Sequence, residues 1–275
     1  MSSTPTHMAE GAARSARHST ALQLLARAGY VASGVLHLLI GVLAVQLAFG
    51  SSSGSADQSG AFRQLAQAPG GAAILWVVTI GFAALALWQL LEALLGVPGT
   101  DSAKEVGARL KAAAKAVLYG VLAWTAAQFA VGGGSGGGGN QQESLTADVM
   151  KSTAGQWLVG AVGLVIVGVG VFHVVKGWRK KFLEDLQGTG GGAVGTAVVR
   201  LGQVGYVAKG LALAVLGGLF VAAAVTHDAD KAGGLDDALH TIREQPFGTV
   251  LLVVTGVGIA AYGVYSFARA RYARL

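Results

Sequence analysis

Two nearly identical hexapeptides lie 176 residues apart in this chain, which indicates that one structural unit is used more than once. The first is Gly-Tyr-Val-Ala-Ser-Gly at residues 29–34, and the second is Gly-Tyr-Val-Ala-Lys-Gly at residues 205–210. Further along each unit, Gly71 recurs as Gly155 and as Gly248, which places a third copy between the other two. Self-similarity at a fixed spacing has to be interpreted before any single motif, so we expect three tandem copies of one unit.

Each unit contains two long apolar runs, and these determine the class of protein. The chain is 53% hydrophobic and only 12% charged, whereas soluble proteins carry about 25% charged residues. Each run approaches the ~20 residues with which a helix crosses ~30 Å of hydrocarbon. The sequence therefore predicts an all-α integral membrane protein with six transmembrane helices in a pseudo-threefold bundle. The runs are Tyr30–Phe49, Ala72–Leu95, Ala113–Val131, Gln156–Val175, Val207–Val225 and Thr249–Phe267.

The repeat also sets the domain boundaries. We expect two-helix units at residues 22–98, 104–182 and 195–272, after a disordered cytosolic tail at residues 1–21. The first apolar run is not expected to be a signal peptide. It follows a long polar tail, and it is the first helix of a unit whose later copies cannot be cleaved leaders.

Basic residues are distributed unevenly between the two ends of the predicted helices. Sixteen of the 20 Lys and Arg residues lie in the two tails, in the connections between units and in the helix ends that flank these connections. The positive-inside rule therefore predicts that both termini are cytosolic. The formal net charge of +6 is then a basic collar that favours anionic lipid headgroups, rather than a nucleic-acid-binding surface.

Three loops on the opposite side occupy the same place in each unit. Asp57–Ala68, Glu143–Ala154 and Leu235–Gln245 suggest short amphipathic helices, because apolar residues recur at helical spacing in the first and third. The acids of the last loop lack the spacing of a calcium loop, so we expect them to be solvated. They are Asp228, Asp230, Asp236 and Asp237.

Motifs that carry chemistry are missing from the sequence. The chain has no cysteine, which excludes disulfides, thiolate metal sites and cysteine nucleophiles. The glycine-rich segments lack the Gly-Lys-Ser/Thr of a phosphate loop, and there is no nucleophile elbow or zincin motif. We therefore expect neither an enzyme nor a metal or cofactor site.

The pattern of the unit resembles a known family. The first helix of a unit begins with Arg and then Gly-Tyr-Val-Ala-x-Gly. The outer turn that follows ends in Pro-x-Gly, and the second helix is rich in small residues and ends with an aromatic and a charged residue. This pattern resembles the domain-of-unknown-function-1206 family over about residues 22–272. The resemblance implies a bacterial membrane protein built from three two-helix domains, and it implies no activity. The middle unit departs from the pattern, since Ala116 replaces the closing glycine and Thr153 stands in place of the proline.

Polar residues inside the apolar runs are the candidate functional residues, because ionisable groups are costly in a membrane. Lys115 and Lys209 occupy one position near the cytosolic end of their helices, and Ser33 takes that position in the first unit. The ordinary interpretation is that the basic side chains extend to the headgroups while aromatics form an interfacial belt. The alternative is that Glu92 pairs with Lys115 or Lys209 and lines a cavity. The candidate cluster consists of Glu92, Lys115, Lys209, His37, Tyr119 and His173.

Two of these residues raise the question of haem, because two imidazoles can ligate one iron. His37 lies about eight residues, or ~12 Å, inside its helix, whereas His173 lies about three residues, or ~5 Å, from the end of its own. Ligands of one iron should lie at one depth, so we expect packed or hydrogen-bonded histidines and no cofactor.

A stripe of small residues follows the odd helices. Gly34 and Gly41 recur as Gly210 and Gly217, so each pair is seven residues apart on one helix face. Small residues allow helices to approach closely in lipid, where apolar burial gives little driving force. We expect this stripe to be a packing seam.

The function that these observations favour is a non-enzymatic component of the bacterial inner membrane that binds a partner or a lipid. The bilayer itself, anionic lipids at the cytosolic face and an unidentified membrane protein are the expected partners, and nucleic acid is not. The alternative is a small-solute or ion transporter or channel that uses the inner polar cluster.

Overall fold

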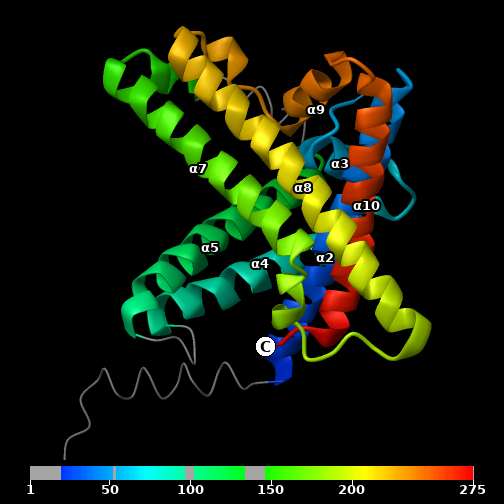
Figure 1. Ribbon diagram of the computed structural model, residues 1–275. Helices are drawn as coiled ribbons and strands as arrows, with labels where there is room; N and C mark the ends of the chain where they lie inside the picture. The colour runs from blue at the N-terminus through cyan, green and yellow to red at the C-terminus, as the bar shows by residue number, and fades with distance from the viewer. Residues whose placement is uncertain (1–19, 52–53, 97–101, 134–145, 275) are drawn as a thin grey trace, which may run out of the picture.

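The computed structural model describes residues 20–51, 54–96, 102–133 and 146–274, and these residues form long helices joined by short turns (Figure 1). The predicted tail falls almost entirely outside the described residues. In the described part of the chain, the only β-structure is one isolated bridge between Leu186 and Ala273. The elements are α2 (Thr20–Ala48), α3 (Gln58–Gln67), α4 (Gly71–Leu95), α5 (Ser102–Ala130), α7 (Thr153–Trp178), η1 (Lys181–Asp185), α8 (Gly192–Thr226), η2 (Ala229–Lys231), α9 (Leu235–Glu244) and α10 (Gly248–Tyr272).

Five of the long helices have the length and apolar composition to cross a membrane, namely α2, α4, α7, α8 and α10. Helix α5 has 29 residues but a lower mean hydropathy, because charged residues occupy its first half. The chain is therefore a helical protein with a threefold repeat and the character of a multi-pass membrane protein. The two outer helices predicted in the first and third units are present as α3 and α9. Most of the loop before the corresponding segment of the middle unit lies in residues 134–145, outside the described part of the chain.

One packing rule connects the three units. The second long helix of each unit packs along the first long helix of the next unit. Thus α4 lies on α5, α7 lies on α8, and α10 lies on α2 (Figure 1). The last pair joins the end of the chain to its beginning and closes the ring. We call the end of the bundle that holds the start of α2 and the end of α10 the terminal end, and the opposite end the α3/α9 end.

Arginines at equivalent positions of α2 and α5, each the first long helix of its unit, follow the same packing rule. Arg27 on α2 donates from Nη1 to the carbonyl oxygens of Ala270 and Arg271 at the end of α10. Arg109 on α5 reaches the Leu94 carbonyl oxygen at the end of α4 over 3.4 Å. The last carbonyls of a helix have no partner within the helix, so each arginine satisfies groups that the preceding unit leaves open.

Glycines allow the paired helices to approach closely. On α2, a Cβ atom added to Gly41 would lie 2.6 Å from the Gly256 carbonyl oxygen of α10. On α8, a Cβ atom added to Gly217 would lie 2.7 Å from the Gly163 carbonyl oxygen of α7. Gly34 and Gly210 lie one step along the same seams, against Gly263 and Gly170 respectively.

Within a unit, the two helices cross closely in the first and third units only. Gly29 on α2 meets Gly81 on α4, and the equivalent Gly205 on α8 lies against Tyr262 on α10. In the middle unit, α5 and α7 have no extensive contact among the described residues. In Figure 1, α4 and α5 run together toward the lower left while α7 and α8 run toward the upper left.

The sequence of the middle unit explains this separation. Lys111 stands where the other units have Gly29 and Gly205, and Val165 stands where they have Gly81 and Gly258. A lysine and a valine cannot occupy a crossing at which backbones touch, because their side chains need the space that glycine leaves open. The middle unit is therefore open where the other two units are closed.

Candidate functional site

Cationic side chains from four helices converge at the terminal end of the bundle, beside the opening of the middle unit. Lys115 interacts electrostatically with Lys111, Arg269, Asp185 and Glu92. His173 on α7 lies within the field of three of the lysines. We call the five cations the basic cluster, and they are Lys111 and Lys115 of α5, Lys176 of α7, Lys209 of α8 and Arg269 of α10.

One acid bridges two members of the basic cluster. Asp185, at the end of η1, accepts a hydrogen bond from the Lys176 ammonium at 2.7 Å and lies 3.7 Å from the Arg269 guanidinium. All three side chains are less than a third exposed, so their charges are poorly screened by water. The Nε atom of Arg269 is buried and has no hydrogen-bond partner in the described part of the chain.

Aromatic rings surround the cations. Tyr206 stacks on Phe182 with ring centroids 5.4 Å apart, and it meets Tyr262 edge to face at 5.1 Å. Arg269 lies 4.6 Å from the Tyr30 ring centre and Lys209 lies 4.3 Å from the Tyr262 ring centre. Cation–π contacts of this kind compensate part of the cost of placing charge away from water.

Lys209 and His37 form a direct polar contact between the third and first units. The Nζ atom of Lys209 lies 2.9 Å from His37 Nε2, and His37 Nδ1 lies 2.7 Å from the Ser33 carbonyl oxygen. A carbonyl oxygen can only accept, so Nδ1 carries the proton and Nε2 accepts from the ammonium. His37 is thus a neutral imidazole with both ring nitrogens engaged in hydrogen bonds.

The remaining candidates lie around the basic cluster in different ways. Glu92 accepts hydrogen bonds from Trp88 Nε1 at 3.2 Å and from Gln89 Nε2 at 2.8 Å on its own helix. Tyr119 stacks on Phe82 with centroids 6.1 Å apart. His173 stacks on the Tyr206 ring at 5.7 Å, and its Nδ1 atom faces the Val169 carbonyl oxygen.

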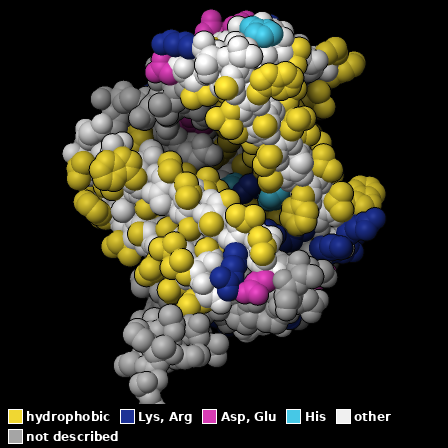
Figure 2. Space-filling view, turned by 90° about the vertical axis from the view of Figure 1, so that its left-hand side faces the viewer, with side chains coloured by type: hydrophobic (Ala, Val, Ile, Leu, Met, Phe, Trp, Pro, Cys, Tyr) yellow, Lys and Arg dark blue, Asp and Glu magenta, His cyan; other side chains and the backbone are white. Residues whose placement is uncertain are grey.

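Positive charge exceeds negative charge at this site. Five cations converge, whereas Asp185 and Glu92 are the acids that act on them in the described part of the chain. Figure 2 shows a hollow on this side of the molecule with Lys or Arg and His side chains on its floor and hydrophobic side chains around it. A hollow with fixed positive charge is suited to binding an anion.

Sequence reasoning found only part of this site. Lys115, Lys209, His37 and His173 were candidates, whereas Asp185 was not, because η1 lies outside the apolar runs. Its signal was the acidic pair Glu184 and Asp185, which follows the basic run Arg179–Lys181 after two apolar residues. Tyr30 and Tyr206 of the repeated hexapeptides were not among the candidates either, but both contact cations.

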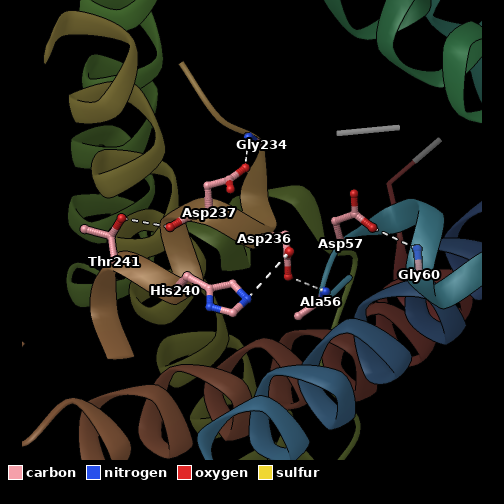
Figure 3. A network of polar contacts seen from close by, with 8 residues as sticks. All are labelled: Ala56, Asp57, Gly60, Gly234, Asp236, Asp237, His240 and Thr241. Carbon is pink, nitrogen blue, oxygen red and sulfur yellow. Dashed lines mark hydrogen bonds and ion pairs between the residues drawn. The ribbon is translucent and has the colours of Figure 1, made fainter. Parts of the chain in front are cut away.

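A second polar network lies at the α3/α9 end and joins the first unit to the third (Figure 3). Asp236 on α9 accepts a hydrogen bond from the Ala56 N–H at 2.6 Å, and His240 Nε2 lies 3.8 Å from its other oxygen. Asp57 caps α3 by accepting from the Gly60 N–H at 2.8 Å, and Asp237 accepts from the Gly234 N–H at 2.6 Å.

These contacts differ from the expected solvated acidic loop. Asp236 and Asp237 bind backbone N–H groups, and no group of three or more metal-ligating side chains occurs among the described residues. Burial is the main cause that raises the pKa of the Asp57 carboxyl, and the neighbouring Asp236 charge acts in the same direction. These contacts make the network a structural clamp between the first and third units.

Replacing Asp236 with alanine should destabilise the protein by about 2 kcal/mol, because it removes a charged acceptor from the N–H of the fully buried Ala56. Thermal unfolding in neutral detergent measures the loss. The exposed Asp230 on the same loop is the matched control, and Asp230→Ala should leave the midpoint unchanged. Equal midpoints for the two variants would show that the clamp contributes nothing.

Comparisons with known proteins place the chain among uncharacterised relatives. A family model described as Domain of Unknown Function (DUF1206) matches three segments, residues 28–96, 110–180 and 204–273. The chain is 28% identical over 248 residues to an "Uncharacterized protein YxxB" of Bacillus subtilis (strain 168), a match that covers 90% of this chain and 89% of the relative. No solved structure shows a significant match.

Proposed function

Because the chain belongs to the DUF1206 family, whose description names no activity, we propose its function from the site itself. The protein is a non-enzymatic component of the bacterial inner membrane that binds an anionic partner group at the basic cluster. The terminal end then faces the cytosol, in keeping with the excess of Lys and Arg in the tails and in the connections between units, with their flanks. The cluster lies at the level of the inner-leaflet headgroups.

The observation that carries this proposal is the excess of cations in a poorly screened site. Lys176 and Arg269 share the single carboxylate of Asp185, and Lys111 and Lys115 lie beside them without an ion pair to it. Like charges repel strongly where little water screens them, so a bound anion would stabilise the arrangement.

The alternative is a transporter or channel that uses the same cluster. Its support is the group of lysines that act on His173, together with the Lys or Arg and His side chains that are visible in the hollow in Figure 2. Against it, the core beyond the cluster toward the α3/α9 end is apolar and continuous across four helices, with Ile40 of α2, Phe82 of α4, Ala212 of α8 and Ile259 of α10 all buried. A path for ions or solutes needs polar groups or water along its length, so this core favours binding over passage.

Binding of phosphatidylglycerol in neutral detergent tests the proposal, with phosphatidylcholine as the zwitterionic comparison. The parent protein should bind the anionic lipid more tightly. Lys111→Gln/Lys115→Gln should weaken that binding about tenfold or more, because it removes two charged donors from the cluster. Native mass spectrometry across a lipid titration gives the affinities.

The matched control removes the same charge elsewhere. Lys180 and Lys181 are exposed and lie outside the basic cluster, so Lys180→Gln/Lys181→Gln should bind like the parent. An equal loss of phosphatidylglycerol affinity in both double variants would show that only the net charge of the protein matters, and this result would overturn the proposal. Reconstituted liposomes that show anion flux through the parent protein, abolished in Lys111→Gln/Lys115→Gln, would establish the transporter instead.

A further inference from the structure

The open middle unit exposes an apolar stripe that the other two units cover. On α7 this stripe consists of Val162, Val165, Val169 and Phe172. Phe172 is 48% exposed, whereas its equivalents Trp88 and Tyr265 are 6% and 0% exposed. On the facing helix α5, Leu118 is 56% exposed, whereas Leu36 on α2 is 3% exposed.

The repeat acts as an internal control for this comparison. Leu164, which neighbours the stripe on α7, is exposed in the middle unit, and its equivalents Ile80 and Val257 are exposed as well. One face of α4, α7 and α10 is therefore exposed in every unit, as general contact with lipid requires. The stripe is different, because its face is buried in two units and uncovered only where α5 and α7 separate.

The stripe ends at the basic cluster. Lys111 lies 5.0 Å from the Phe172 ring centre, and His173 follows directly in the sequence. From Val162 to Phe172 the helix rises ~15 Å at 1.5 Å per residue. This length is close to half of the ~30 Å hydrocarbon core, which is the depth of one leaflet.

We infer that the gap between α5 and α7 binds one anionic phospholipid, which rests on the anion binding proposed above. Its phosphate lies among Lys111, Lys115 and Arg269, and one acyl chain lies along the α7 stripe. An apolar wall of one-leaflet length that ends in uncompensated positive charge matches the shape and charge of such a lipid. A free anion would use the charges alone and would leave the stripe uncovered.

Three probes separate the lipid from a free anion: phosphatidylglycerol, phosphatidylcholine and the water-soluble headgroup fragment glycerol 1-phosphate. Val165→Gln and Leu118→Gln place a polar group on the exposed apolar faces of α7 and α5 that border the gap, without disturbing the core. Each should weaken phosphatidylglycerol binding about five- to tenfold, because burial of an apolar side chain against the acyl chain is lost. Leu164→Gln is the control, and its affinity should equal that of the parent.

The outcomes distinguish this inference from the anion binding on which it rests. Phosphatidylglycerol binding that depends on Val165, with no competition by millimolar glycerol 1-phosphate, supports the lipid. Two results would overturn the lipid proposal while leaving an anion site. One is that glycerol 1-phosphate competes with the same affinity as the whole lipid, and the other is that Val165→Gln binds phosphatidylglycerol like Leu164→Gln. Equal binding of phosphatidylcholine and phosphatidylglycerol, with no effect of Lys111→Gln/Lys115→Gln, overturns both.

Discussion

Replacing Gly217 with leucine is expected to lower the thermal midpoint of the protein by about 10 °C. A Cβ atom at this position would lie 2.6 Å from the Val167 backbone nitrogen and 2.7 Å from the Gly163 carbonyl oxygen. Backbone atoms cannot move aside without separating α7 from α8, so the cost lies near the upper end of overpacking, at about 3 kcal/mol. For a chain of this size, that cost corresponds to a shift of about 10 °C.

The adjacent residue provides the control. A Cβ atom added to Gly218 would meet no atom within 4 Å, so Gly218→Leu should melt close to the parent. Both variants change one glycine to leucine in the same turn, and they share any gain in helix propensity. Thermal denaturation followed by circular dichroism in detergent compares them. If Gly217→Leu melts like Gly218→Leu, the α7–α8 contact is not a close glycine seam.

Replacing Asp185 with asparagine is expected to cost about 2–3 kcal/mol. The substitution preserves the shape of the side chain but leaves Lys176 and Arg269 without their shared carboxylate. Removing one partner of a buried ion pair leaves an uncompensated charge, which is costly, and the partial exposure of Asp185 moderates the loss. Thermal unfolding in neutral detergent measures the change.

The same variant links stability to the proposed anion. Phosphatidylglycerol should stabilise Asp185→Asn more than it stabilises the parent, because the lipid phosphate can replace the lost negative charge. Glu184→Gln is the control, since Glu184 is exposed and adjacent to Asp185. An Asp185→Asn variant that is as stable as Glu184→Gln, with no added response to anionic lipid, would contradict the role of Asp185 as the shared counter-ion of Lys176 and Arg269.

The sequence predicted the threefold repeat, most of the helices and the face of α2 and of α8 that carries small residues. Apolar length and the spacing of Gly34, Gly41, Gly210 and Gly217 depend only on local periodicity, which a sequence records directly. The sequence did not identify the partners of these glycines. Gly256 and Gly263 share the same spacing, but a helical face does not say which neighbouring helix it meets.

The candidate site was predicted less completely, because it depends on tertiary placement. Lys209 was expected to extend to the headgroups or to pair with Glu92, and it contacts His37 of another unit instead. A long flexible side chain reaches several possible partners, and only the packing of α8 against its neighbours selects one. The open middle unit did have a sequence signal, since Lys111 replaces a glycine found in both other units.

The closure of the ring by α10 against α2 determines when during synthesis the molecule can become complete. Helix α2 receives its partner α10 only after the helices between them have been synthesised, so the Gly34 and Gly41 face remains uncovered until α10 has been inserted. Contacts between residues so distant in sequence are slow to form. A nascent chain that stops before Gly248 would present the unpaired Gly34 and Gly41 face of α2 to the bilayer, which makes insertion of α10 a condition for assembly.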